Sequence, residues 1–343
     1  MMKIQNVAEL EERLSRPGDA DASAMAALNG DLLILGVGGK MGPSLARLAR
    51  RAADLAGTRQ RIVAVARFSD ASLPAQLATQ GIETITCDLL DPGALNNLPD
   101  IPNVIFMAAR KFDTAGAEHL TWAMNTYLPG LVAERYRNSR IVAFSTGNVY
   151  PLRSASQGGA VESTPVGPVG EYAQSALGRE RMFENGSMRW GTRVAILRLN
   201  YAVELRYGVL VDIGRAVFER RPIPLCMPFV NVIWQLDANS WCLRSFPYCQ
   251  SPPFVLNITG PETLSVRDLA VEFGRHFGIE PILLPPDAEG STALLSDASK
   301  AHALFGFPTV NPAEMIEWIA HWIREGGLML NKPTHFQNRD GKF

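Results

Sequence analysis

The sequence predicts an α/β protein built on an open, doubly wound parallel sheet, and three observations support this prediction. Short apolar runs recur along residues 31–199, and segments of helical periodicity separate them. Uninterrupted apolar runs are typical of strands that are buried on both faces of a parallel sheet. The first of these runs ends in a cluster of glycines, and a helical pattern follows directly. Strands and helices that alternate in this way form a sheet with helices on both faces.

The expected elements follow one another regularly along the chain. Strands are predicted where apolar runs are bounded by polar residues or glycine, and helices where apolar residues recur three or four positions apart. The predicted strands are 31–35, 61–67, 81–88, 104–109, 140–145, 192–199 and 253–258, and the best-marked helices are 115–135, 265–277 and 312–325.

The glycine-rich stretch 36–42 joins the first strand to the first helix of the sheet. Glycines at 36, 39 and 42 allow a tight turn, close approach of the backbone to a pyrophosphate and close packing of helix on strand. Pro43 suits the first turn of a helix, whose free N–H groups and partial positive charge attract phosphate. A glycine-rich turn in another α/β protein is the alternative interpretation. The residues expected to bind a dinucleotide here are Gly36, Gly38, Gly39, Lys40, Met41 and Gly42.

Composition excludes several other classes of protein. The 343 residues are 47% hydrophobic and 20% charged, with a formal net charge of −1, as in ordinary globular proteins without a nucleic-acid or membrane partner. No apolar run approaches the roughly 20 residues of a membrane span, and we expect no export signal at the N-terminus. The four cysteines lack a CxxC pairing and the five histidines lack ligand spacing, so we expect free thiols, no metal site and a cytoplasmic location.

The chain is expected to divide into three regions. Residues 1–30 form an N-terminal helical extension, because their apolar residues recur at helical spacing. Residues 31–199 form a Rossmann-like dinucleotide-binding domain. Residues 200–343 contain many prolines, and we expect them to complete the sheet in part and otherwise to form a smaller mixed substrate-binding region. Their polar tail, 332–340, lies over either a neighbour or the cleft.

Two stretches at strand ends resemble sequences of a known family. The fifth strand ends in Phe144–Tyr150 (FSTGNVY), and the sixth ends in Leu197–Ala202 (LRLNYA). These stretches, with the glycine spacing 36–39–42, are similar to the SSxxVYG, LRxxNVYG and GxxGxxG sequences of the extended short-chain dehydrogenases, the NAD(P)-dependent epimerase/dehydratase family.

Three further pieces extend the resemblance in the expected order. Cys87–Asp91 is similar to the DL element of the family, Phe106–Ala109 to its HLAA strand end, and Asn125 to a structural Asn in a helix. The resemblance covers residues 31–325, and the combination of the pieces makes it specific.

The resemblance implies a nicotinamide dinucleotide cofactor. Asp88 and Leu89 would contact the adenine. Ala108 and Ala109 would line the cofactor, and Asn125 and Tyr172 would also contact it. Asp88 follows a strand, at the edge where open α/β sheets bind their ligands. The alternative is that Asp88 caps a helix that starts with Leu89.

The end of the second strand bears on the choice between NAD and NADP. An acidic residue there would bind the ribose 2′-OH of NAD, whereas an arginine accommodates a 2′-phosphate. The sequence has Ala66 where NAD-selective relatives have Asp, and Arg67 follows it. Arg67 therefore favours NADP, through a bidentate contact with phosphate or by stacking on adenine. The alternative is a solvated arginine at a strand end.

The resemblance also implies the catalytic residues. Thr146 matches the catalytic Ser/Thr of the family, Ser145 places a second hydroxyl beside it, and Tyr172 matches the acid–base tyrosine. A hydroxyl at this strand end hydrogen-bonds a substrate oxygen while hydride is transferred. The alternative is that the hydroxyls of Ser145 and Thr146 cap the next turn.

One position departs from the family pattern. The family sequence YxxxK ends in a lysine that lowers the pKa of the tyrosine, but Ala176 stands there. An unassisted phenol has a pKa near 10 and is a poor base at neutral pH. Lys111, after the fourth strand, is our candidate for the missing charge, and a surface cation of a loop is the alternative. Lys40, in the glycine loop, is expected to face phosphate.

The region after residue 199 is expected to shape the substrate pocket. Polar groups beside aromatic walls suit a sugar-like ligand. The residues assigned to substrate binding are Asn148, Asn200, Tyr201 and Trp234, and the alternative for Trp234 is a place in the core.

Two functions follow from these observations. The first is an NAD(P)-dependent epimerase/dehydratase-like enzyme that acts on a sugar or sugar-derived substrate by hydride transfer. The second is a catalytically inactive sensor or scaffold that binds dinucleotide, which Ala176 favours and which the retained Tyr172 and Thr146 oppose. A lyase or isomerase without net hydride transfer is a third possibility. The resemblance implies a homodimer formed through the helices that carry Asn125 and Tyr172.

Overall fold

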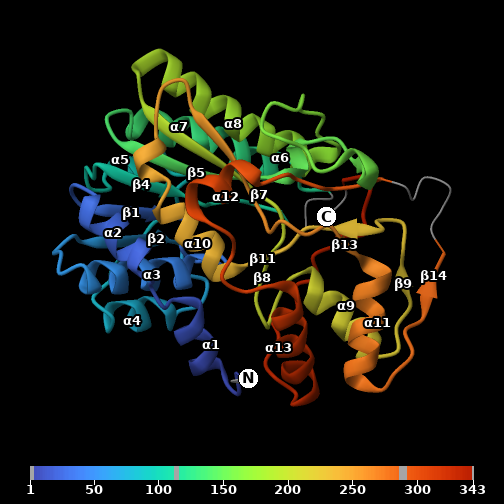
Figure 1. Cartoon of the computed structure of the whole chain (residues 1–343). Coiled ribbons are helices and arrows are strands. Elements are labelled where there is room, and N and C mark those ends of the chain that lie inside the picture. Colours follow the sequence, from blue (N-terminus) through green and yellow to red (C-terminus); the bar gives the residue numbers. More distant parts are fainter. Residues whose placement is uncertain (1–3, 112–115, 286–291, 342–343) are drawn as a thin grey trace.

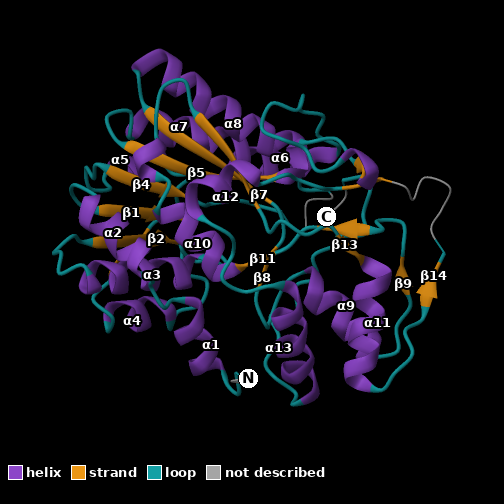
Figure 2. Cartoon of the chain, viewed as in Figure 1, coloured by secondary structure: helices purple, strands orange, loops and turns teal. Residues whose placement is uncertain are grey.

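Seven apolar segments pair in parallel to form the central sheet, as the sequence predicts. The computed structural model describes residues 4–111, 116–285 and 292–341. The strand order is β12-β7-β5-β4-β1-β2-β3 (Figures 1 and 2). The strands are β1 (Leu32–Leu35), β2 (Ile62–Ala66), β3 (Glu83–Thr86), β4 (Asn103–Phe106), β5 (Arg140–Thr146), β7 (Arg193–Leu199) and β12 (Phe254–Ile258).

The strand order creates one topological switch point. The chain runs from β1 outward through β2 to β3, then returns to place β4 on the other side of β1. Ligands of open α/β sheets bind at such a point, outside the carboxyl ends of the strands. The glycine loop after β1 and the end of β4 therefore mark the expected position of a dinucleotide.

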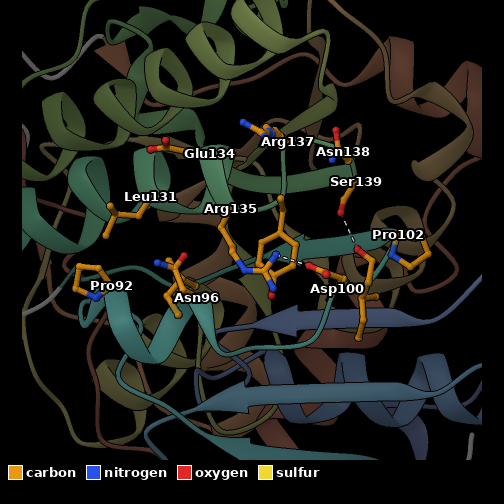
Figure 3. Close-up of a pocket in the computed structure, with 13 residues that line it drawn as sticks. Pro92, Asn96, Asp100, Pro102, Leu131, Glu134, Arg135, Arg137, Asn138 and Ser139 are labelled. Atoms are coloured by element: carbon orange, nitrogen blue, oxygen red, sulfur yellow. Dashed lines mark hydrogen bonds and ion pairs between the residues drawn. The ribbon is translucent and has the colours of Figure 1, made fainter.

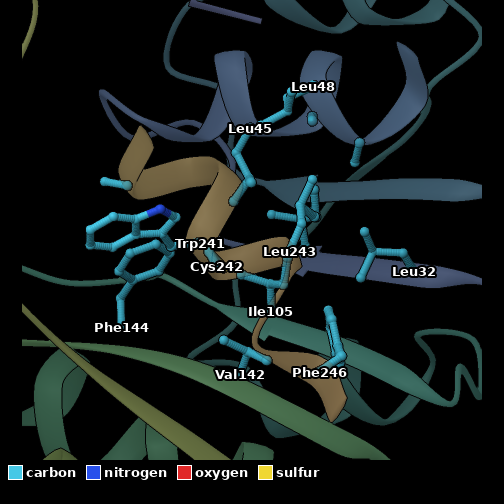
Figure 4. Close-up of a cluster of buried hydrophobic side chains, with 14 of the residues drawn as sticks. Leu32, Leu45, Leu48, Ile105, Val142, Phe144, Trp241, Cys242, Leu243 and Phe246 are labelled. Atoms are coloured by element: carbon cyan, nitrogen blue, oxygen red, sulfur yellow. The ribbon is translucent and has the colours of Figure 1, made fainter. Parts of the chain in front are cut away.

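Helices cover both faces of the sheet. On one face, strand residues such as Ile105, Val142 and Phe144 pack against Leu45 of α3 and Trp241 of α10 (Figure 4). On the opposite face, Phe106 meets Phe183 of α8 edge to face, with ring centroids 5.3 Å apart. The helices in these two layers are α2 (Asp19–Ala27), α3 (Gly42–Leu55), α4 (Leu73–Ala78), α5 (Pro92–Asn96), α7 (Leu128–Arg135), α8 (Gly170–Trp190), α10 (Gln235–Leu243) and α12 (Ser299–Phe305).

The helix predicted over 115–135 is divided into three pieces. They are α6 (Glu118–Trp122), a π-helical turn η1 (Ala123–Tyr127) and α7. Residue 115 lies outside the described part of the chain. Pro129 lies in the first turn of α7, and Asn125 lies within the π-helical turn. Single π turns inside helices occur frequently at functional sites.

A second apolar core belongs to a smaller lobe. Its helices α9 (Val209–Phe218), α11 (Val266–Phe277) and α13 (Pro312–Arg324) pack side by side (Figure 1). The N-terminal helix α1 (Val7–Leu14) adds Leu10 and Leu14 to this core. The remaining short strands are β6 (Arg153–Ser154), β8 (Ala202–Val203), β9 (Ile223–Pro224), β10 (Phe229–Val230), β11 (Ile233–Trp234), β13 (Leu264–Ser265), β14 (Leu283–Leu284) and β15 (Thr292–Ala293).

Residues beyond 199 contribute to both parts of the molecule. They supply α10, β12 and α12 to the sheet layers and form most of the smaller lobe. Within the described residues, no helix is both long and apolar enough to cross a bilayer.

Candidate dinucleotide and acid–base site

The glycine loop adopts a geometry that requires glycine at two positions. Gly36 has φ +92° and donates its N–H to Val65 O at 2.9 Å. A Cβ at Gly36 would lie 2.5 Å from Ala108 N, and one at Gly42 would lie 2.1 Å from Val37 O. Gly38 and Gly39 are exposed directly before α3. The backbone therefore approaches the crevice without side chains, beside a helix N-terminus, which fits a bound pyrophosphate.

Helix α10 holds the start of α3 in place. Ser44 Oγ donates to Met41 O at 3.0 Å. That hydroxyl in turn accepts from Gln235 Nε2 at 2.9 Å and from Asn239 Nδ2 at 3.0 Å. All three side chains are buried or nearly buried. These bonds fix the loop before any ligand binds, which lowers the ordering cost of binding.

The ends of β2 and β3 present the side chains that the sequence places there. Ala66 lies beside Gly38, where a Cβ would be 3.3 Å from the Ala66 Cβ. Arg67 is exposed. Asp88 is also exposed, and its Oδ1 accepts from Leu90 N at 3.1 Å, while Leu89 is buried. Asp88 thus caps the following turn and still faces solvent at the carboxyl edge of the sheet.

Asn125 is a supporting residue and has no polar atom left for a cofactor. Its Nδ2 donates to Arg110 O at 2.8 Å and to Ser175 Oγ at 3.0 Å. Its Oδ1 accepts from Arg110 N and from Arg179 Nη2, each at 2.9 Å. The side chain is fully buried. The expectation that Asn125 contacts the cofactor is wrong, because its hydrogen bonds are all used to join the loop after β4, near Ala108 and Ala109, to α8.

Ser145 also differs from its expected role. Its Oγ donates to Glu180 Oε1 at 2.5 Å, inside the protein. Glu180 forms a buried two-point ion pair with Arg198, with distances of 3.0 and 2.7 Å. Arg198 also donates to Tyr150 OH at 2.8 Å. Ser145 is therefore part of a structural network that ties α8 to β5 and β7, and its expected catalytic hydroxyl does not face the crevice.

Thr146 and Tyr172 meet as the resemblance implies. Thr146 ends β5, and Tyr172 lies in the first turn of α8 with only 7% of its surface exposed. Burial raises the pKa of Tyr172, while the positive charge of Arg179 and a hydrogen bond with Thr146 act in the opposite direction to lower it. This pair places the phenol of Tyr172 at the carboxyl edge of the sheet, beside the hydroxyl of Thr146.

Lys111 approaches the phenol from the end of β4. Its Nζ lies 5.8 Å from the centroid of the Tyr172 ring. Burial lowers the pKa of Lys111 to about 8. Ala176 is fully buried in a small apolar cluster with Val149 and Tyr150. The structure thus brings Lys111 close to Tyr172, and the position of the family lysine is closed by packing.

Sequence reasoning missed Arg179, which follows Tyr172 by two helical turns. Its Nη1 donates to Phe144 O at 2.8 Å, and its side chain is buried. A basic residue seven positions after the tyrosine lies on the same face of a helix, and this spacing was the available signal.

The predicted substrate residues occupy different environments. Asn148 Nδ2 donates to Thr146 Oγ1 at 3.0 Å, so it adjoins the acid–base pair. Asn200 is buried and donates to Leu294 O at 3.3 Å. Tyr201, with φ +48°, is half-buried near Tyr172. The assignment of Trp234 to the pocket wall is wrong, because the ring is fully buried against Trp318, with centroids 5.6 Å apart.

Lys40 points toward the smaller lobe. Its Nζ lies 3.2 Å from the centroid of the Tyr207 ring, a cation–π contact. Burial and the charges of Lys111 and Lys332 lower its pKa to about 6. The expectation that Lys40 faces phosphate is therefore corrected: in this structure the side chain links the glycine loop to the smaller lobe.

A segment near the C-terminus reaches the same region. Asn338, Arg339 and Gly341 line a cavity of about 30 Å³ together with Asn148 and Tyr201. Of the two placements considered for this segment, over a neighbour or over the cleft, the structure shows the cleft.

A larger hollow lies elsewhere. It measures about 780 Å³ at the amino-terminal edge of the sheet, before β4 and β5 (Figure 3). Arg135 and Asp100 form an ion pair in its wall, and Ser139 Oγ donates to Ile101 O at 2.7 Å. Its wall therefore lies at the opposite edge of the sheet from Tyr172.

The fold and the glycine loop together define a dinucleotide-binding protein of the doubly wound α/β class. The sequence also matches the model of the NAD dependent epimerase/dehydratase family over residues 32–203. The chain therefore belongs to this family. A search of curated proteins found no match.

Solved structures share the fold over most of the chain. The UDP-Glc/GlcNAc 4-epimerase of Campylobacter jejuni has a TM-score of 0.71 at 20% identity, covering 87% of this chain and 99% of that one. The UDP-glucuronic acid 4-epimerase of Bacillus cereus, in complex with UDP-glucuronic acid and NAD, has a TM-score of 0.70 at 18% identity, covering 86% and 99%. WbmG of Bordetella bronchiseptica, in complex with NAD and UDP, has a TM-score of 0.70 at 19% identity, covering 88% and 97%.

Proposed function

We propose that this protein is an NAD(P)-dependent oxidoreductase-type enzyme that acts on a nucleotide-linked sugar. The observation that carries the proposal is the pairing of Tyr172 with Thr146 beside the glycine loop. Family membership and the UDP-sugar ligands of structural neighbours support the substrate class. The neighbours share only the fold at their level of identity, so the class of sugar is part of the proposal.

The acid–base step is assigned to Tyr172. Its phenolate takes the proton of a substrate carbinol. Thr146 hydrogen-bonds the carbinol oxygen and also orients the Tyr172 phenol. A nicotinamide bound here would supply the site with a reversible hydride acceptor for the carbinol carbon. Asn148, bonded to Thr146, stands next to this oxygen.

Lys111 is proposed to compensate in part for the missing lysine. Its Nζ lies 5.8 Å from the centroid of the Tyr172 ring, and a positive charge at this position would favour the phenolate. With a pKa of about 8, Lys111 carries this charge at neutral pH. We expect Lys111→Ala to abolish turnover or cofactor binding, and unchanged kinetics and affinity would remove Lys111 from the site.

NADP is the proposed cofactor, held by Gly36–Gly42 with Arg67 at its adenosine end. The absence of a carboxylate at Ala66 and the exposed guanidinium of Arg67 support a 2′-phosphate. Structural neighbours bind NAD, which remains the alternative.

A homodimer and a cytoplasmic location are also proposed. Exposed apolar side chains gather on the helices named for the dimer: Leu120 and Trp122 on α6, Tyr127 on η1 and Met188 on α8. Burial of such residues favours association. All four cysteines are free thiols, as in proteins of a reducing compartment.

A dinucleotide-binding sensor without catalysis is the second candidate, and Ala176 favours it. To separate the two, titrate NADH and NADPH by fluorescence and then follow nicotinamide absorbance with a panel of UDP-sugars. Turnover that Tyr172→Phe eliminates without loss of cofactor affinity supports the enzyme. Tight cofactor binding without turnover across the panel supports the sensor. Failure to bind either cofactor rejects both.

A further inference from the structure

Arg179 is a buried cation whose described polar partners are all uncharged. Only 3% of its surface is exposed. Its guanidinium donates to Phe144 O at 2.8 Å and to Asn125 Oδ1 at 2.9 Å, and its Nε has no hydrogen-bond partner. The charge of the neighbouring Glu180 acts to raise the pKa of Arg179, but its carboxylate forms its ion pair with Arg198 at 2.7 Å, not with Arg179. An unpaired buried charge is costly to a folded protein, so its retention calls for a function.

Arg179 and Tyr172 lie on the same face of α8, and the positive charge of Arg179 acts to lower the pKa of the phenol. Residues seven positions apart share one face of a helix, and helical side chains lean toward the N-terminus. Asn125, which accepts from Arg179, also donates to Ser175 Oγ. The guanidinium of Arg179 therefore lies near Ser175. The next residue is Ala176, which has only a methyl group at the position of the family lysine.

We propose that Arg179 supplies the positive charge that the family lysine would supply from position 176. In this arrangement the ionised phenol of Tyr172 is the counter-ion of the buried guanidinium. When Tyr172 takes a substrate proton the pair is lost, and when it returns the proton the pair forms again. Arg179 acts through Tyr172, so it is a positioning residue, and the inference rests on the proposed function.

Other titratable groups near Tyr172 do not replace this charge. Lys111 has a pKa of about 8 and is neutral at higher pH, whereas a guanidinium keeps its proton across that range. The phenols of Tyr201 and Tyr207 belong to the smaller lobe, and burial raises the pKa of each. Titration above pH 8 therefore isolates the effect of Arg179. Among the described residues, the charged and titratable groups shown to act on or lie near Tyr172 are Lys111, Arg179, Tyr201 and Tyr207, and Glu180 acts on Arg179.

The test is a tyrosinate absorbance titration of the full chain without substrate, taken as the difference from the matching Tyr172→Phe protein. Arg179→Gln keeps amide donors but removes the charge. We expect the midpoint of the titration step assigned to Tyr172 to rise by one pH unit or more, which is a tenfold change in the proton equilibrium. Arg179→Lys should keep the step within half a unit. The control Arg181→Gln alters an exposed arginine paired with Glu184 and should change nothing. An unshifted step in Arg179→Gln overturns the proposal.

A second measurement needs no change at position 179. In protein labelled with ¹⁵N-arginine, the chemical shift of the Arg179 Nε–H resonance should change with pH as Tyr172 ionises. In the Tyr172→Phe protein this chemical shift should not change with pH. A flat resonance in the unmodified protein overturns the proposal. Neither measurement requires turnover. If the protein is inactive but the ionisation of Tyr172 still depends on Arg179, the proposed enzyme function is rejected and the Arg179–Tyr172 pair is retained.

An independent observation concerns the segment 334–341. Thr334 donates its backbone N–H and its hydroxyl to Asp212 Oδ2, at 2.7 and 2.6 Å, and Phe336 is buried in the core of the smaller lobe. Arg339 donates to Cys226 O at 2.8 Å and to Thr292 O at 2.7 Å.

The segment ends against the first turn of α8. Gly170 and Gly341 both have positive φ, and a Cβ at Gly341 would lie 2.1 Å from Val169 O. The remaining cavity of about 30 Å³ holds about one water molecule, whereas ligand pockets measure about 300–1,000 Å³. The structure assigns segment 334–341 the role of a strap that closes the substrate pocket and withdraws when a nucleotide sugar enters. This inference also rests on the proposed function.

The strap is tested with UDP as the probe. Gly341→Val should push the end of the segment off Val169 while Phe336 keeps its anchor, and we expect UDP to bind at least tenfold more tightly by calorimetry, with an unchanged Kd for NADH. Gly326→Val is the matched control, because Gly326 has φ +69° with nothing within 4 Å. Equal UDP affinity in the two variants, or no UDP binding to either while NADH still binds, overturns the strap. Loss of NADH binding in the unmodified chain rejects the proposed function instead.

Discussion

Replacement of Gly36 by alanine tests whether the glycine loop is shaped for a cofactor. The added Cβ would lie 2.5 Å from Ala108 N, about 1 Å inside an ordinary contact of 3.4 Å, and the neighbour is backbone that cannot rotate away. The positive φ of Gly36 adds about 1–2 kcal/mol of strain, and overpacking adds about 1–3 kcal/mol. We therefore expect Gly36→Ala to lower the free energy of unfolding by about 2–5 kcal/mol.

Gly36→Ala should also weaken cofactor binding. If the loop moves away from the end of β4, its N–H groups lose their alignment with the pyrophosphate, and we expect the Kd for NADH and NADPH to rise at least tenfold, or about 1.4 kcal/mol. The control is Gly57→Ala, because Gly57 has φ +67° with no atom within 4 Å. It should show backbone strain alone, about 1–2 kcal/mol, and normal affinity.

The assays are urea unfolding and fluorescence titration of each cofactor. Our reasoning is refuted if Gly36→Ala matches Gly57→Ala in stability and binds cofactor within threefold of the unmodified protein. That result would mean that the approach of the loop to Ala108 is not needed for binding.

Three further predictions follow from charged groups. Arg67→Glu should weaken NADPH binding at least tenfold while affecting NADH less, and equal losses for both would argue against a 2′-phosphate contact. Glu180→Ala should lower unfolding free energy by about 3–5 kcal/mol, because it leaves buried Arg198 without its partner, whereas the exposed pair partner Glu184→Ala should cost under about 1 kcal/mol; urea unfolding distinguishes these outcomes. Lys40→Met should stabilise the protein most near pH 6 and progressively less toward pH 10. The folded-state pKa of Lys40, about 6, lies below the value of 10.5 for an unfolded chain, so the cost of burying the charge is fully present below pH 6 and is relieved as the pH rises. A stability difference that does not vary with pH would contradict this assignment.

The sheet and the loop could be predicted because their signals are local. The inner strands of a parallel sheet are buried on both faces and are therefore mostly apolar, so runs such as Leu32–Leu35 and Ile62–Ala66 are visible without knowledge of their partners. Gly36 and Gly42 are needed for a turn within seven residues. The pairing of Thr146 with Tyr172 was reached through resemblance, because the two residues lie on different elements.

The roles of four residues could be assigned only from the three-dimensional surroundings of their side chains. Ser145 is adjacent to Thr146 in sequence, but alternate strand residues point to opposite faces, and its hydroxyl meets Glu180. Trp234 packs on Trp318, which follows it by more than eighty residues. Asn125 and Lys40 have the expected residue types, but their partners come from other elements. Contacts between side chains on different elements cannot be predicted directly from a single sequence.

The sequence by itself determined the doubly wound sheet, the glycine loop and the family, because apolar runs, turn glycines and ordered motifs act over a few residues. Tertiary structure decided which charges surround Tyr172 and what covers the pocket. The charge of Arg179 acts on Tyr172 only because α8 packs on β5 and the π-helical turn, where Arg179 binds Phe144 O and Asn125 Oδ1. Residues 334–341 lie over the cleft only because Thr334 and Phe336 dock on the smaller lobe. Electrostatic coupling and access depend on distances through space, and those distances exist only after the elements have packed.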